Sequence, residues 1–453
     1  MFSLLNNTIR WYIIIGVLLY AILFAHYGGD CISWYNALNI YTFTSYALIL
    51  WKSNKLAAEN YTCRQLGVTI FVYSLLFVSL YLMMSEYYTG NTFIFSVGDA
   101  RTYYNFGMEF LERPHSQWIP FLESKKWDFE DWGAPIAATI MLHIIPSKLF
   151  VNFCYITMTT LGGICLFKMG KAIMTTRYAY MASLSYAISS YSLFFMGSFL
   201  KEVLLVFFVI VSYYLLYMYM QNKRIQYMLW GGLISLVVIF FRPPIIIFIG
   251  MSYMTMLLIN TKSSLFRFFV IFFIIIAAIA AIGIAQYSAE RYANGGNVTE
   301  SYEYVHYSTF KKIVLYFGAL IGPFPYLLQV EEEISLKPLY GAGLLFKLFL
   351  FYAFWKGLWY AVKHKCRELM PIYIFVLLEV VGLSVALDGL ELRKALPHVP
   401  LSIMASFWYL SVWDKKLENE KADSLSRIWA IRQFVITLCV VFGAVLVWNT
   451  MKT

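Results

Sequence analysis

The segment Ser96-Val97-Gly98-Asp99-Ala100-Arg101-Thr102-Tyr103-Tyr104 places a carboxylate and a guanidinium close together in a chain that is otherwise mainly apolar. It follows three apolar runs and opens the longest polar loop of the sequence. A carboxylate at a membrane surface can take a proton from a sugar hydroxyl or bind a metal ion. Asp99 is therefore the leading candidate for a catalytic group, and the side of the membrane that it faces decides which substrates it can meet.

Short polar segments elsewhere carry cations or ion pairs between apolar runs, where no charge is needed to end a helix. Arginine and lysine in such places can stabilise a phosphate leaving group, although single cations also anchor helices at the interface and Arg-Pro-Pro also makes a tight turn. Asp99 is the predicted base and Arg242 the leading phosphate ligand. The predicted substrate-binding residues are Arg101, Tyr103, Lys201, Glu202, Arg242, Glu391, Arg393, Lys394 and His398.

The composition predicts the class of protein that positions these residues. Hydrophobic residues make up 60% of the chain and charged residues only 13%, which is typical of an all-α, polytopic transmembrane protein. Two short apolar stretches, 134–146 and 313–328, are interrupted by proline or glycine and are assigned to the membrane surface or to re-entrant segments. About thirteen runs are long enough to span, at 10–26, 33–51, 66–84, 152–170, 178–197, 203–220, 226–241, 244–261, 265–287, 340–362, 370–387, 396–413 and 431–449.

The distribution of charge predicts an orientation. The net charge is +10, and with a cytoplasmic N-terminus the basic excess falls in the cytoplasmic connections, as the positive-inside rule expects. It therefore needs no nucleic-acid partner. Residues 1–453 form one transmembrane domain, with extracytoplasmic segments at 85–151, which contains amphipathic juxtamembrane helices, and at 288–339. We expect a multi-pass membrane protein with a cytoplasmic N-terminus and its site on the extracytoplasmic face.

The chemistry that suits such a site is sugar transfer from a lipid-linked donor. The chain has no P-loop and no Rossmann glycine fingerprint, so a polyprenyl-phosphate donor fits better than a nucleotide sugar. The predicted partners are the polyprenyl-phosphate-linked glycan, a glycan acceptor and the lipid bilayer. No cofactor is assigned. A divalent metal held by Asp99 with Asp128 or Asp131 stays open, because no ligand spacing decides it.

These residues resemble a family. Asp99, Arg101 and Tyr103, with the apolar helix after them, resemble the Asp-x-x-x-Tyr-type start of the first outer loop in GT-C superfamily glycosyltransferases. The resemblance implies that Asp99 is the catalytic base or a metal ligand. Gly133-Ala134-Pro135 and the stretch 152–171 are similar to the juxtamembrane helix and next span of those enzymes. Lys201-Glu202 and Arg242-Pro243 resemble Wzy-type polymerases of capsule and O-antigen repeat units.

Two alternative functions remain open from the sequence. The first is a lipid-linked oligosaccharide flippase, although such transporters usually show internal repeats and broken helices, and neither is evident here. The second is a membrane glycan ligase or acyltransferase with His398 or His115 as the base. Separately, Lys347 and Glu379 lie at similar depth within their predicted spans, so we expect them to pair with each other. The pair would be a structural ion pair or part of a proton relay.

Overall fold

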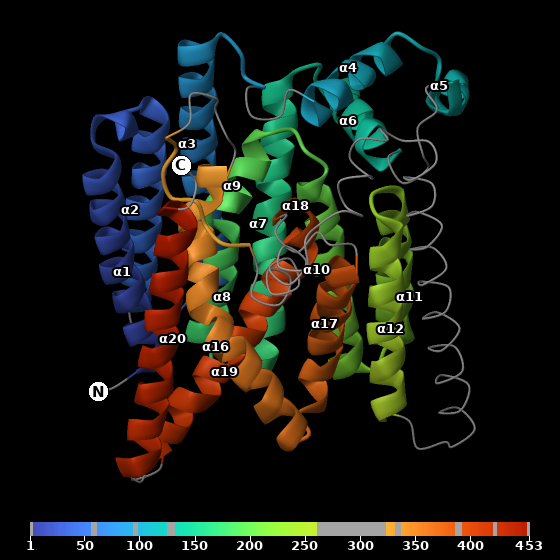
Figure 1. Ribbon diagram of the computed structural model, residues 1–453. Coiled ribbons are helices and arrows are strands. Elements are labelled where there is room, and N and C mark those ends of the chain that lie inside the picture. Colours follow the sequence, from blue (N-terminus) through green and yellow to red (C-terminus); the bar gives the residue numbers. More distant parts are fainter. Residues whose placement is uncertain are drawn as a thin grey trace.

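The computed structural model describes residues 3–55, 61–93, 98–124, 132–260, 323–330, 337–385, 392–419 and 424–450, and these residues form helices without any strand (Figure 1). The α-helices are α1 Leu4–Tyr27, α2 Trp34–Lys55, α3 Cys63–Thr89, α4 Asp99–Leu111, α5 Trp118–Ser124, α6 Gly133–Ile144, α7 Lys148–Ile173, α8 Thr176–Ala187, α9 Ser190–Gly197, α10 Glu202–Asn222, α11 Ile225–Val237, α12 Pro243–Asn260, α16 Gly341–Lys363, α17 Met370–Val385, α18 Leu392–Ala395, α19 Val399–Asn419 and α20 Ser424–Thr450.

Among the described residues, seven helical stretches are long and apolar enough to cross a membrane. The other predicted spans within the described ranges are helical too, but they are shorter or more polar. The predicted span 265–287 lies outside the described residues, as do most of segment 288–339 and the stretch 313–322. The seven stretches are Leu4–Cys31, Cys63–Thr89, Lys148–Ile173, Glu202–Asn222, Lys337–Lys363, Leu392–Lys416 and Ile431–Thr450.

The predicted span 178–197 is two helices rather than one. α8 ends at Ala187 and α9 begins at Ser190, and every residue from 178 to 206 is buried. The Ser189 side chain caps α9 at Ser192, and the Ser190 hydroxyl accepts a hydrogen bond of 2.8 Å from the Gly343 amide of α16. Serine hydroxyls therefore satisfy backbone groups at the break, as a helix interruption at membrane depth requires.

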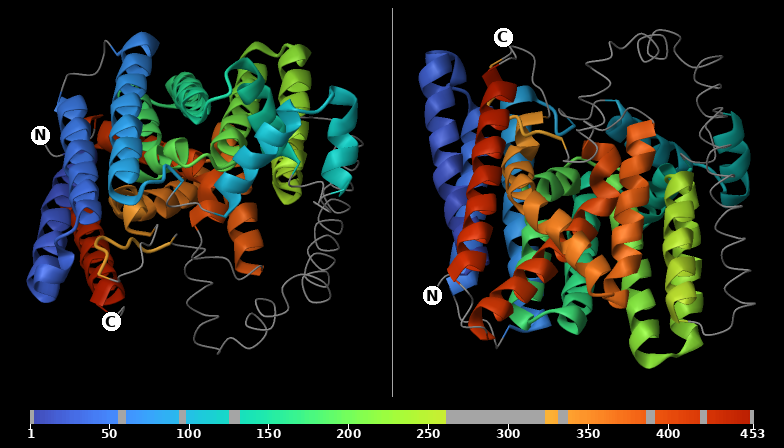
Figure 2. Two further views of the ribbon diagram at one scale, coloured as in Figure 1. Left: turned by 90° about the horizontal axis from the view of Figure 1, so that it is seen from above. Right: turned by 60° about the horizontal axis from the view of Figure 1, so that its bottom comes forward.

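The buried α8–α9 segment lies in the middle of the bundle. α7 packs against α3, α8 and α10, whereas α19 packs against α8 and α16. Figure 2 shows α1, α2 and α20 at one side of the bundle and the pair α11 and α12 at the opposite side. The packing leaves α19 almost wholly enclosed by protein.

Short helices cover one end of the bundle (Figure 1). α4 packs on α6, and the contact is close because a Cβ on Gly107 would lie 2.7 Å from the Leu142 side chain. The sequence predicts this helix, but its buried face consists of Ala100, Tyr103, Gly107 and Phe110. Tyr104, Met108 and Leu111, whose helical spacing predicts a shared apolar face, are only partly buried. Small residues, which a pattern of large apolar residues overlooks, mark the contact.

α6 is the short helix expected over 134–146. Its 12 residues extend about 18 Å at 1.5 Å per residue, which is shorter than the ~30 Å hydrocarbon core. A Cβ on its first residue, Gly133, would lie 2.7 Å from the Phe240 carbonyl oxygen. α6 therefore fits directly against the backbone that joins α11 to α12.

Candidate functional site

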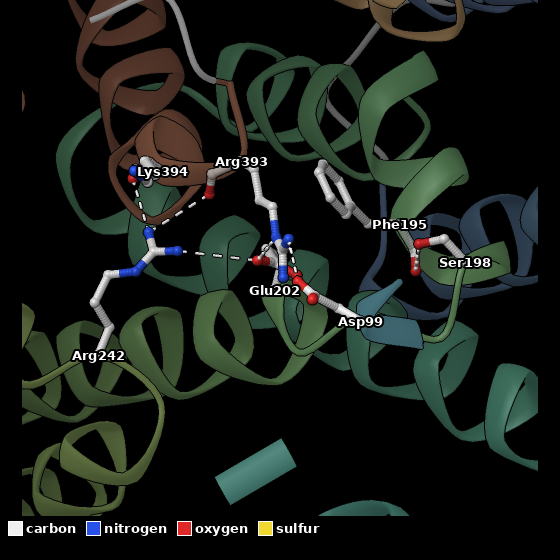
Figure 3. Close-up of polar contacts among 7 residues, drawn as sticks. All are labelled: Asp99, Phe195, Ser198, Glu202, Arg242, Arg393 and Lys394. Atoms are coloured by element: carbon white, nitrogen blue, oxygen red, sulfur yellow. Dashed lines mark hydrogen bonds and ion pairs between the residues drawn. The ribbon is translucent and has the colours of Figure 1, made fainter. Parts of the chain in front are cut away.

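Four charged residues from distant parts of the sequence converge near the ends of α4, α10, α11 and α18 (Figure 3). They are Asp99, Glu202, Arg242 and Arg393, all of which the sequence had singled out. The Glu202 carboxylate lies between the two guanidiniums: its Oε1 is 2.5 Å from Arg393 Nε and 3.9 Å from Arg242 Nη2. We call these four residues the Asp99 cluster.

Arg393 bridges two carboxylates that differ in exposure. Its Nε atom contacts Glu202, and its Nη1 atom lies 2.5 Å from Asp99 Oδ2. The Glu202 side chain is fully buried, whereas 51% of the Asp99 side chain is exposed. The cluster therefore has a dry inner ion pair and a wet outer one.

Helix termini help to place both acids. Asp99 is the first residue of α4, and Glu202 is the first residue of α10. Carboxylates are favoured in the first turn because unpaired amides and the helix dipole give that end a partial positive charge. Glu202 Oε2 has no hydrogen-bond partner within the part of the chain that the structure describes.

Arg242 is placed by the turn that Arg-Pro-Pro makes. α11 closes with a 3-10 turn at Val238–Phe240, and Pro243 begins α12, where its missing amide costs nothing. The guanidinium Nη1 donates to the Lys394 carbonyl at 3.0 Å and to the Arg393 carbonyl at 3.5 Å. The motif is thus both a helix junction and a connection from that junction to α18.

An aromatic residue in an uncommon conformation leads into α10. Phe199 has φ +62°, a left-handed value that costs a non-glycine residue about 1–2 kcal/mol. Its ring is fully buried and lies 5.7 Å from that of Tyr104 on α4, centroid to centroid. Packing holds the turn, and the turn sets the beginnings of α4 and α10 beside each other. No sequence signal marks this role, because a phenylalanine in an apolar run usually indicates core.

The remaining predicted residues are not members of the Asp99 cluster, and they differ in exposure. Arg101 is exposed, Tyr103 is buried under α4, and Lys201 is buried at the end of the Phe199 turn. Lys394 contributes its carbonyl oxygen to Arg242. Glu391 lies outside the described residues.

His398 is buried instead of exposed at the site. Its Nδ1 atom lies 3.6 Å from Glu379 Oε2, and both side chains are almost completely enclosed. Within the described residues the group in contact with Glu379 is thus the His398 imidazole, which forms an ion pair only when it is protonated, and the expected direct contact with Lys347 is not made. Lys347 is still near enough to interact electrostatically with both residues. The charge pattern drew attention to Lys347 and Glu379, but it could not show that the 3-10 turn Leu396–His398 brings an imidazole to Glu379.

The described residues contain no group of three His, Cys, Asp or Glu side chains that could hold a metal ion. Asp128 and Asp131, the other expected ligands, lie outside those residues. No protein-family model and no curated protein matches this chain. The Asp99 cluster joins an exposed carboxylate to the partly exposed guanidinium of Arg393, with that of Arg242 on the far side of Glu202, so it can accept a proton and bind an anion.

Proposed function

We propose that the protein is an integral membrane glycosyltransferase that uses a polyprenyl-(di)phosphate-linked donor and a glycan acceptor. The observation that carries the proposal is the contact of Asp99 with Arg393, which Glu202 joins to Arg242. One carboxylate and two guanidiniums are the groups that this reaction needs, and they come from separate outer connections of the predicted topology. The GT-C-like motif at Asp99 and Tyr103 points to the same chemistry.

The proposed step is a substitution at the anomeric carbon of the donor sugar. The acceptor oxygen forms a bond to the anomeric carbon of the donor, and the bond from that carbon to the phosphate oxygen breaks. The acceptor proton passes to the Asp99 carboxylate, and the polyprenyl (di)phosphate leaves with the electron pair. Arg242 and Arg393 stabilise the negative charge that develops on the phosphate.

The proposed location is the extracytoplasmic face of a bacterial cytoplasmic membrane, in the synthesis of a cell-surface polysaccharide. The seven long apolar helices support a membrane location, and the positive-inside argument supports this orientation. Repeat-unit polymerisation is the specific form that the Lys201-Glu202 and Arg242-Pro243 resemblance favours.

Asp99→Asn tests the proposal directly. The variant keeps the size of the side chain and removes the base, so we expect glycan transfer from a lipid-linked donor to fall by about 10²–10⁴-fold, with the unfolding temperature retained and no loss of donor binding. The matched control is Glu112→Gln, which removes one exposed carboxylate at the other end of α4. Transfer by Asp99→Asn at the rate of Glu112→Gln would exclude Asp99 as the base.

A flippase for lipid-linked oligosaccharide is the second candidate, favoured by the break between α8 and α9. Interrupted helices are common in transporters. Here, however, the hydroxyl groups of Ser189 and Ser192 donate to the Tyr186 carbonyl, so the break is closed by the protein itself. If the protein is a flippase, the Asp99→Asn variant would still move lipid-linked glycan across the membrane of vesicles. If it is the enzyme, neither the wild type nor Asp99→Asn would move the lipid.

A further inference from the structure

The two carboxylates on Arg393 are held with unequal strength. The inner partner, Glu202, is fully buried, and separating a buried ion pair leaves uncompensated charge at a cost of several kcal/mol. The outer partner, Asp99, is half exposed, and exposed ion pairs contribute little because water solvates the separated groups well. Arg393 is therefore anchored on its Nε side and exchangeable on its Nη1 side.

The outer contact also occupies the groups that the proposed reaction uses. Asp99 Oδ2 accepts from Arg393 Nη1 at 2.5 Å, and this ion pair makes the carboxylate a weaker base for a hydroxyl proton. The same contact fills the side of Arg393 on which a phosphate oxygen would lie. Arg242 stands across Glu202 from this position, with its guanidinium turned toward the carbonyls of α18 (Figure 3).

We propose that the Asp99 carboxylate is an internal occupant of a phosphate site at Arg393, and that the donor phosphate displaces it. This inference rests on the proposed function and deepens it. A phosphate or diphosphate carries more charge than a carboxylate and can accept two parallel hydrogen bonds from a guanidinium, so it competes well for Arg393. Once displaced, Asp99 has both oxygens free for the acceptor hydroxyl, and the donor binds before the acceptor.

The displacement predicts opposite effects of one substitution on binding and on transfer. Asp99→Asn removes the competing anion without touching either arginine. We expect the full-length protein in nanodiscs to bind inorganic pyrophosphate about two- to fivefold more tightly as Asp99→Asn than as wild type, the ratio that follows from the usual strength of an exposed ion pair. Isothermal titration calorimetry measures both dissociation constants.

Two controls separate this local effect from general charge and from misfolding. Glu112→Gln removes the same charge at the far end of α4 and is expected to bind pyrophosphate as the wild type does. Arg393→Gln is expected to weaken binding by at least tenfold. Because Asp99 is half exposed at a helix terminus, Asp99→Asn should fold, and thermal unfolding of each variant checks this.

Equal or weaker pyrophosphate binding by Asp99→Asn would overturn the displacement, and so would a failure of both forms to bind. A separate transfer assay with lipid-linked glycan distinguishes this outcome from failure of the proposed function. Tighter binding without any wild-type transfer would leave the displacement intact and remove the glycosyltransferase. Wild-type transfer with unchanged binding would do the reverse.

Discussion

At the scale of single residues, the Asp99 cluster depends on Arg393, which joins an exposed carboxylate, Asp99, to a buried one, Glu202. Asp99, Glu202, Arg242 and Arg393 were identifiable because each is charged in a short connection between apolar runs. The contacts among these four residues were not identifiable from the sequence. Only the structure shows that Glu202 is the buried centre and that Arg393 contacts both acids. Pair contacts across 191 residues of chain leave no periodic signal in one sequence.

Arg242→Lys tests whether the shape of the guanidinium matters as well as its charge. Lysine keeps the positive charge but cannot donate in a planar fork to carbonyls and phosphate together. We expect the donor KM to rise roughly tenfold, equivalent to about 1.4 kcal/mol of binding, with a smaller change in kcat.

Arg224→Lys is the matched control, because Arg224 is exposed at the beginning of α11 while Arg242 follows its end. Steady-state kinetics with varied donor measures the difference. Identical donor KM values for the two variants would limit Arg242 to its role as a helix junction.

At the scale of elements, hydropathy predicts helices well and their breaks and faces less well. A run of apolar residues over 178–197 satisfies the length of a span, yet the chain there forms α8 and α9. Ser189 and Ser190 favour the break because serine hydroxyls cap helix ends, but serines are also common in continuous membrane helices. The decisive partner, Gly343 of α16, is distant in sequence.

Gly133→Ala tests whether α6 positions the junction that carries Arg242. A Cβ there would lie 2.7 Å from the Phe240 carbonyl oxygen and 3.0 Å from its carbonyl carbon, and backbone atoms cannot rotate away as side chains can. We expect a loss of about 1–3 kcal/mol of stability, as for other overpacked contacts, together with a higher donor KM because α6 pushes on the residues before Arg242.

The comparison variant is Gly250→Ala on α12, where an added Cβ would meet no atom within 4 Å. It should be neutral or slightly stabilising, since alanine favours helix over glycine by about 1 kcal/mol. Thermal unfolding and donor KM are measured for both. If Gly133→Ala behaved like Gly250→Ala, α6 would not control the junction.

At the scale of the whole molecule, a second polar cluster fastens parts of the chain that are far apart in sequence. Asp414 of α19 accepts hydrogen bonds from the Ser3 hydroxyl at 2.6 Å, from the Leu4 amide at 2.9 Å and from the Tyr178 hydroxyl. The carboxylate thereby caps α1 and joins it to α8 and α19. Composition predicted the membrane bundle, but the order in which its helices pack depends on such long-range contacts.

Asp414→Ala should therefore lower stability without altering the chemistry of the site. Asp414 is 7% exposed, and its loss leaves the Leu4 amide and two hydroxyls without their acceptor, which we expect to cost about 3 kcal/mol or more. Asp414→Asn retains one carbonyl oxygen and should lose less, whereas Lys415→Ala, at the exposed neighbouring position, should unfold at the wild-type temperature.

The Asp414 contacts are far from the Asp99 cluster, because Tyr178 lies in the first turn of α8 while the cluster lies beyond the end of α9. Below the unfolding transition, the donor KM of all three variants should therefore match that of the wild type. If folded Asp414→Ala had a different donor KM from the wild type, the contacts of Asp414 at one end of the bundle would be coupled through α8 and α9 to donor binding at the other end.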